Sequence, residues 1–223
     1  MSNQSLPEPA PKRQPGRPRV MSDDAVYMAG LQVLAMHGSA GLTLGRVAEI
    51  LGVTPAAVRQ RFGSKRGFLV EMAKRRVEQT EHRFSAARAA HSSPLAALQA
   101  AFIAEMDQIG EPQQVANAFS AYTDNIDDPE MRATFALELA AMEKHIGELL
   151  QEAVRAGELR AAVTPQLISA VLAAVEGTML VWAIAPRGDI RARIREAVEV
   201  VLGLDGRQGA PLGPVLRSRP SRR

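Results

Sequence analysis

The stretch from Gly41 to Phe68 constrains the fold most, because it holds two short helical patterns separated by a sharp break. Apolar residues of the first pattern recur at the i, i+3, i+4, i+7 spacing of one helix face. They are Leu44, Val47, Ala48 and Leu51. Gly52 can adopt the positive φ of a helix-ending turn, and Thr54 followed by Pro55 is a strong helix start. The sequence therefore predicts a helix, a tight turn and a second helix.

The second helix has only a narrow apolar side, formed by Val58 and Phe62. Its remaining positions are small, polar or cationic. They are Ala56, Ala57, Arg59, Gln60 and Arg61. A short helix with one apolar stripe and a small, basic outer surface fits the major groove of DNA. We therefore interpret residues 55–62 as a candidate DNA-reading helix, ended by Gly63.

This stretch resembles the helix-turn-helix of the tetracycline-repressor (TetR) family of transcriptional regulators. The matching residues are Thr43-Leu44, Val47-Ala48, Gly52-Val53-Thr54, Val58, Phe62, Ser64-Lys65 and Leu69. The resemblance reaches back over a helix ending at Met36-His37-Gly38, and forward more loosely to about residue 204. The chain departs from the family at Arg59, where the family usually carries Tyr in the recognition helix. Gly45, a weak helix former, is a second departure.

The resemblance implies an all-α protein of about nine helices. It would have a helix-turn-helix DNA-binding domain at residues 21–66 and a helical regulatory and dimerisation domain at residues 67–204. Composition favours the same fold class, because aromatic residues make up only 4% of the chain while Ala, Leu, Val and Glu fill long stretches. No stretch has a convincing strand pattern.

Charge is distributed unevenly along the chain. Residues 1–80 hold 12 Lys and Arg against 6 Asp and Glu, and residues 81–205 hold 10 against 18. Residues 206–223 hold 5 Arg and no acid. A basic first third beside an acidic middle is the distribution expected if one domain alone binds DNA.

Both ends are rich in Pro and Arg and lack helical periodicity, so we expect disordered basic segments at residues 1–20 and 205–223. Within the first, the run from Lys12 to Arg19 resembles an AT-hook, with Arg17 and Arg19 flanking Pro18. Such a segment is narrow enough to enter the minor groove at A·T tracts. The alternative is a solvated basic tail that adds only non-specific attraction to phosphates.

Lys65 and Arg66 occupy the first turn of the next helix, where cations oppose the helix dipole. Their position makes sense if a DNA phosphate binds there, a role that the resemblance implies for Lys65. The alternative is a pair of solvated surface cations. The complete set of predicted DNA-binding residues is Arg17, Arg19, Thr43, Arg46, Thr54, Ala56, Ala57, Arg59, Gln60, Arg61 and Lys65.

Two features of the second domain suggest partners. Helices predicted within residues 164–204 have broad apolar faces, which the family resemblance assigns to a homodimer; they could instead pack on their own chain. Bulky side chains on the body helices could line an apolar pocket for a small-molecule effector, or be ordinary core. They are Phe102, Met106, Phe119, Tyr122, Phe135, Met142 and Trp182.

Enzyme chemistry finds no support in the sequence. The four histidines are scattered, cysteine is absent, and no Gly-rich phosphate loop or nucleophile–base arrangement is evident. We therefore expect no catalytic site, no metal and no cofactor. No apolar run approaches the roughly 18 residues of a membrane span, and no signal peptide is visible, so we expect a cytoplasmic protein with no membrane partner.

Three functional hypotheses follow. The first is a dimeric transcriptional regulator, a repressor released from a palindromic operator by a small molecule. The second is an architectural protein that binds A·T-rich DNA without effector control. The third, an α-helical enzyme or carrier with a vestigial DNA-binding end, requires a polar titratable pocket that the sequence does not reveal.

Overall fold

A computed structural model of the chain describes residues 21–107 and 110–204. These residues form nine α-helices and no strand, so the predicted all-α class is confirmed. The helices are α1 (Asp23–Gly41), α2 (Leu44–Leu51), α3 (Pro55–Phe62), α4 (Lys65–Ala90), α5 (Pro94–Met106), α6 (Pro112–Thr123), α7 (Pro129–Arg155), α8 (Pro165–Ile184) and α9 (Ile190–Leu202). The segments 1–20 and 205–223, including Arg17 and Arg19, lie outside the described residues.

Local capping sets most of the helix starts. The hydroxyl oxygens of Thr43, Thr54 and Ser64 accept hydrogen bonds from the backbone N–H groups of the first turns of α2, α3 and α4. Each bond satisfies a donor that has no partner within the helix. At the other end of α2, Gly52 adopts a left-handed conformation with φ 65° and ψ 34°. The predicted helix, turn and second helix are therefore present.

The first helix differs from the sequence expectation at its end. Gly38 breaks the regular helix as predicted, with φ 64° and ψ −179°, but one more turn follows and reaches Gly41. This backbone conformation is essentially restricted to glycine. A Cβ atom at Gly38 would lie 3.3 Å from Ser120 Oγ and 3.4 Å from Asn117 Oδ1. The kink therefore lets α1 approach α6 closely.

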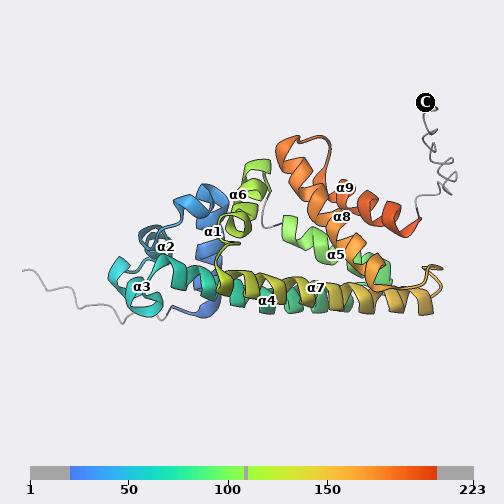
Figure 1. Cartoon of the computed structure of the whole chain (residues 1–223), viewed down its shortest axis with the longest axis horizontal. Helices are drawn as coiled ribbons and strands as arrows, with labels where there is room; N and C mark the ends of the chain where they lie inside the picture. The colour runs from blue at the N-terminus through green and yellow to red at the C-terminus, as the bar shows by residue number, and fades with distance from the viewer. Residues whose placement is uncertain (1–20, 108–109, 205–223) are drawn as a thin grey trace, which may run out of the picture.

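Figure 1 shows an elongated molecule with the head (α1 to α3) at one end and α8 and α9 towards the other. Helices α4 and α7 run side by side along the long axis and connect the two ends. Helix α6 packs on α1, so the body (α4 to α9) contacts the head through both α4 and α6.

Two clusters of buried residues make up the core. The head cluster joins α1, α2 and α3 to the first turns of α4 and to Met131 and Phe135 of α7. The body cluster is formed by α4, α5, α6, α7, α8 and α9. Helix α4 supplies Phe68 to the first cluster and Phe84 to the second. A single helix therefore spans both parts of the chain.

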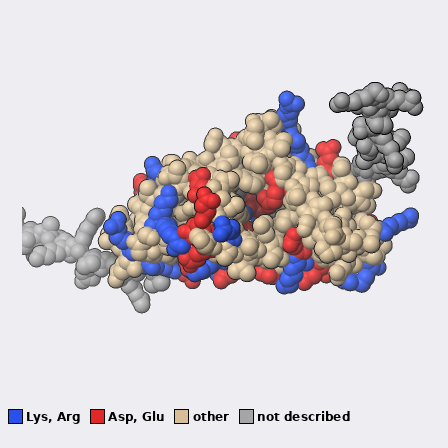
Figure 2. Space-filling model, viewed as in Figure 1, with Lys and Arg blue, Asp and Glu red and all other residues tan. Residues whose placement is uncertain are grey.

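Helix α8 differs from the expectation that no segment could span a bilayer. It is the one helix among the described residues that is long and apolar enough to cross a membrane by length and composition. Buried core helices share those properties, so this is weak evidence for a membrane segment. One side of α8 packs on the body through Val171, Val175 and Met179, while Val181 and Ile184 are exposed. Figure 2 shows few charged side chains over this helix.

Candidate nucleic-acid interface and ligand cavity

Helix α3 is held by one buried residue and presents its other side to solvent. Val58 is completely buried in the head cluster, and Phe62 packs edge-on against Phe68 with ring centroids 5.1 Å apart. Arg59 and Gln60 are exposed on the outer side. Neither side chain has a hydrogen-bond or ion-pair partner among the described residues. These two groups are therefore available to an external ligand.

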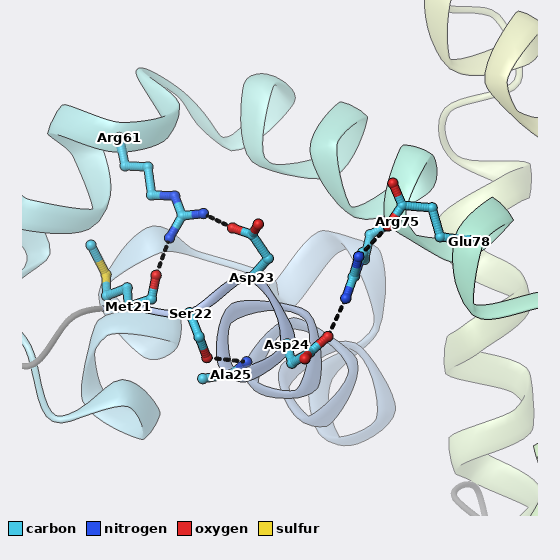
Figure 3. A network of polar contacts seen from close by, with 8 residues as sticks. All are labelled: Met21, Ser22, Asp23, Asp24, Ala25, Arg61, Arg75 and Glu78. Carbon is cyan, nitrogen blue, oxygen red and sulfur yellow. Dashed lines mark hydrogen bonds and ion pairs between the residues drawn. The ribbon is translucent and has the colours of Figure 1, made fainter. Parts of the chain in front are cut away.

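Arg61, although on the same helix, is engaged within the head. Its guanidinium group donates to the carboxylate of Asp23 and, over 2.5 Å, to the main-chain carbonyl of Met21 (Figure 3). Both partners lie at the start of α1. Arg61 also lies over the Phe62 ring, 5.0 Å from its centroid. Arg61 would have to leave Asp23 before its guanidinium could face a base edge.

Two other basic residues that the sequence predicted to bind DNA instead donate hydrogen bonds to carbonyl groups at the end of α1. Lys65 Nζ donates to the carbonyl oxygen of Ser39 over 2.6 Å, and Arg46 Nη1 donates to that of Gly41. Carbonyl groups at a helix C-terminus lack partners and carry partial negative charge, which attracts cations. In this conformation Lys65 therefore fastens α4 to α1.

The remaining predicted DNA-binding residues lie on the helix starts. Thr43 and Thr54 are exposed caps, Ala56 is exposed, and Ala57 is half-buried. The predicted set thus gathers on the α2–α3 end of the molecule, apart from Arg17 and Arg19, which lie outside the described residues. Figure 2 shows Lys and Arg side chains over this end, interspersed with Asp and Glu.

A further ion pair, which sequence reasoning missed, connects the start of α4 to the start of α7. Arg66 Nε and Nη2 donate to the two carboxylate oxygens of Asp128 over 2.6 and 2.9 Å. Arg66 also pairs with Glu130 at 3.0 Å. The hydrogen bond from Arg66, followed by those from the backbone N–H groups of α7, holds the pKa of Asp128 below its usual range. The acidic start of α7 was visible in the sequence, but its partner was not.

Helix α6 makes a second connection to the head. Its Ser120 Oγ accepts a 2.8 Å hydrogen bond from the N–H of Ser39, and Asn117 Nδ2 donates to the carbonyl of Ala35 over 2.8 Å. Asn125 Nδ2, just past α6, donates to Ser39 Oγ over 3.2 Å. The end of α1 is therefore bonded to α6 as well as to Lys65.

A cavity of about 1240 Å³ opens between α1, α4, α5 and α6. Most of its lining side chains are Ala, Leu, Ile or Met, and they come from both head and body. Of the seven side chains predicted to line an effector pocket, Tyr122 and Phe135 border this cavity. Phe102, Met106, Met142 and Trp182 are buried in the body cluster, and Phe119 packs half-buried against it.

Charged side chains that sequence reasoning missed are buried beside the cavity. Arg76 donates to Glu138 and to Glu105, each over 2.5 Å, and Arg83 donates to Glu105 over 3.0 Å. Tyr122 donates to Glu138 over 2.8 Å. Burial would raise the pKa of Glu105, but Arg83 and Arg76 outweigh it and the pKa is lowered. Only Glu138 could have been identified from the sequence. It lies three residues after Phe135 on α7, so the helical period places it on the same buried side.

Glu176 on α8 lies near this group of charges. Burial, with the added repulsion of Glu105, raises its pKa to about 7. Within residues 21–107 and 110–204, no three His, Asp or Glu side chains are grouped so that they could hold a metal ion. The expected lack of a metal, a cofactor and a catalytic site stays a prediction.

No protein-family model and no curated protein matches this chain. Solved structures do match it over most of its length. A protein from Rhodococcus sp. assigned to the TetR family of transcriptional regulators has 24% identity and a TM-score of 0.62, over 81% of this chain and 97% of that one.

Two further similar structures are of regulators with named roles or ligands. The fatty acid degradation regulator FadR from Bacillus halodurans has 14% identity and a TM-score of 0.63, over 83% of this chain and 97% of its own. A transcriptional regulator from Saccharomonospora viridis, in complex with choline, has 15% identity and a TM-score of 0.65, over 84% and 98%. The helix order, the α2–α3 corner and these similarities agree: the chain has the all-α fold of the TetR-family transcriptional regulators.

Proposed function

We propose that the protein is a dimeric DNA-binding transcriptional regulator, a repressor that a small-molecule effector releases from a palindromic operator. The observation that carries the proposal is the exposed pair Arg59 and Gln60 on α3, which has no partner among the described residues. A helix presented at one end of a molecule, with free donors on its outer side, suits the major groove. The TetR fold supports the same reading.

The proposed contacts divide into two groups. Arg59 and Gln60, with Ala56 and Ala57, would contact base edges. An Arg that binds guanine disfavours the wrong base by roughly 1–3 kcal/mol. Thr43, Thr54, Arg46 and Lys65 would contact the phosphate backbone. Arg61 would join them after leaving Asp23. Arg17 and Arg19 remain candidates for the minor groove.

Dimerisation through about residues 164–204 is supported by the apolar surface of the last two helices. Leu180, Val181 and Ile184 of α8 and Val200 of α9 are exposed in the single chain. Such a patch of large apolar side chains commonly marks an interface. Two copies related by a twofold axis would place their α3 helices about 34–36 Å apart, in successive major grooves.

The cavity is the proposed effector site. Its walls come from α1 in the head and from α4, α5 and α6 in the body, so a bound molecule would contact both. Similar folds bind dissimilar molecules, since one structure of a Bacillus subtilis FadR contains stearoyl-CoA and the S. viridis structure contains choline. An effector shifts the protein between head positions only by its differential affinity for them.

Two further parts of the proposal concern organisation. We propose that residues 21–66 act as the DNA-binding domain and residues 67–204 as the regulatory and dimerisation domain, in a protein of the cytoplasm. Helix α4 belongs to both cores, which supports its role as the connection between them.

In vitro selection of bound DNA followed by footprinting tests the proposal. A regulator of this kind protects one short palindrome, whereas an architectural protein protects A·T-rich DNA broadly. Arg59→Ala should weaken binding to the selected site about 10-fold or more while leaving binding to random DNA nearly unchanged. Arg160→Ala, an exposed arginine beyond α7, is the matched control. Equal losses on selected and random DNA would remove Arg59 from base recognition, and failure to select any sequence would overturn the proposal.

A further inference from the structure

Two N–H groups on one edge of the Arg83 guanidinium group, Nε and Nη2, have no hydrogen-bond partner among the described residues. Arg83 lies on α4 and borders the cavity, and its Nη1 donates to Glu105 Oε2 over 3.0 Å. Nε and Nη2 are both buried. Among the described residues, Arg83 is the one side chain with two buried polar atoms that lack a hydrogen-bond partner. Unpaired buried donors are costly, so a partner for this edge is favoured.

The same edge binds carboxylates elsewhere in this protein. Arg66 uses Nε and Nη2 to hold Asp128 over 2.6 and 2.9 Å. Arg191 uses the same two nitrogens to hold Asp107 over 3.0 and 2.6 Å. Two parallel N–H donors match the two oxygens of a carboxylate. Arg83 therefore has, without a partner, the same pair of N–H donors that holds a carboxylate at Arg66 and Arg191.

The charges that line the cavity also favour an anion. Three arginines border it, Arg76, Arg83 and Arg195, against two acids. Both acids already hold arginines, since Glu105 binds Arg76 and Arg83 and Asp107 binds Arg191. Glu176, whose carboxyl group could attract a cation, is not among the lining residues. A cationic molecule would find no free acid on the cavity wall.

Most of the remaining lining residues are apolar, although glutamines and histidines are among them, and the cavity is large. Apolar side chains of α1 and α5 contribute to its lining, including Met28, Ala35, Ala100 and Ile103. The volume of about 1240 Å³ exceeds the range of roughly 300–1000 Å³ usual for small-molecule sites. A long apolar chain would fit along walls of this kind.

We propose that this cavity binds amphipathic carboxylic acids, with the carboxylate on the Nε–Nη2 edge of Arg83 and the apolar chain between α1 and α5. The edge is covered by protein atoms here, so the Arg83 side chain turns towards the cavity as the acid enters. The ligand then contacts α1 directly and fixes its distance from α4. The inference rests on the proposed function, because it treats the cavity as the effector site.

Titration of the purified full chain with dodecanoate, below its micelle concentration and without DNA, tests the proposal by calorimetry. Dodecanol supplies the same chain without charge, and dodecyltrimethylammonium supplies it with the opposite charge. We expect dodecanoate to bind and dodecanol to bind at least about 10-fold more weakly. Equal binding of acid and alcohol, tightest binding of the cation, or no binding at all would overturn the proposal.

Arg83→Met should weaken dodecanoate binding about 10- to 100-fold and leave dodecanol binding unchanged. Arg88→Met is the matched control, because Arg88 lies on the same helix and pairs with Glu148 and Glu152 away from the cavity wall. If Arg83→Met fails to fold, Arg83→Lys keeps one charge but lacks the two-nitrogen edge and should also lose affinity. Undiminished dodecanoate binding by either folded variant would assign the acid to another site. Because no DNA is present, this outcome is independent of operator binding.

Discussion

The ammonium group of Lys65 lies 2.6 Å from the main-chain carbonyl oxygen of Ser39 and donates a hydrogen bond to it. The N–H group of Ser39 donates in turn to Ser120 Oγ on α6. One residue at the end of α1 therefore contacts both the start of α4, which follows α3, and α6, which borders the cavity. A change in the position of α6 would act on the head through Ser39.

Lys65→Met should lower the free energy of unfolding by about 1–2 kcal/mol, because the Ser39 carbonyl loses a charged donor in a half-buried position. Urea denaturation measures the difference. Lys74→Met, an exposed lysine on the same helix, should change stability by less than about 0.5 kcal/mol. Equal stability of the two variants would show that the bond to Ser39 adds nothing. A fall of about one in the salt slope of DNA binding for Lys65→Met would indicate a phosphate contact.

Asp23→Asn should strengthen DNA binding at low salt, because it releases Arg61 from its ion pair and removes a negative charge beside α3. The expected change is a salt slope steeper by up to about one, measured by fluorescence anisotropy over a range of salt concentrations. Stability should fall by less than about 1 kcal/mol, since the pair is largely exposed. Asp24→Asn is the matched control, because Asp24 pairs with Arg75 on α4 (Figure 3). The prediction fails if both variants bind DNA alike.

Gly38→Ala should destabilise the protein by about 1–3 kcal/mol, because an alanine side chain is strained at φ 64° and ψ −179°. The new Cβ would also press on Ser120 Oγ, the acceptor for Ser39. Gly45→Ala provides the contrast, since Gly45 is an exposed helical residue with only Thr43 Oγ1 near its Cβ position. That variant should gain about 0.5–1 kcal/mol. Thermal unfolding of both variants measures the difference, and a neutral Gly38→Ala would contradict the strain argument.

Glu176→Gln should stabilise the protein at pH 8 by about 1–3 kcal/mol and have little effect near pH 4.5. Burial raises the pKa of Glu176 to about 7 from an ordinary value of 4.5, so the native state holds a proton that the unfolded state releases. The neutral acid therefore stabilises the native state fully below pH 4.5, and this stabilisation is lost as the pH rises through 7. Glutamine stays uncharged and avoids this loss.

Chemical denaturation between pH 4.5 and pH 8, at one protein concentration, gives the stability difference at each pH. Glu71→Gln, which removes an exposed carboxyl group on α4, is the control. A difference between wild type and Glu176→Gln that does not change with pH would show that the pKa of Glu176 is the same in the native and unfolded states.

The helix-turn-helix was predictable because its signals are local. Thr43, Thr54 and Ser64 cap helices through hydrogen bonds to residues only three positions away, and Gly52 turns the chain within one residue. Val58 follows the helical period and is buried as the pattern required. The exposure of Arg59 was also predictable, because it lies off the narrow apolar side formed by Val58 and Phe62.

The partners of the other charged residues could not be predicted in this way. Arg61 and Asp23 are 38 positions apart, and Arg76 and Glu138 are 62 apart, so nothing local indicates that they meet. The sequence predicted Arg61 as a DNA contact because it is a cation on the candidate DNA-reading helix, and Lys65 because of its place at a helix start and the family resemblance. Their bonds to Asp23 and Ser39 appear only when α1 lies against α3 and α4.

By itself the sequence determined the helix-turn-helix boundaries, the apolar faces of its helices and the all-α class, because capping, glycine turns and helical periodicity act within a few residues. Only the tertiary structure decided which charges are paired, that α1 joins α6 at Ser39, and that a cavity bordered by Arg83 opens between head and body. Ion pairs and cavities depend on helices distant in the chain coming together. Their positions are set by the packing of α4 and α6 on the rest of the molecule.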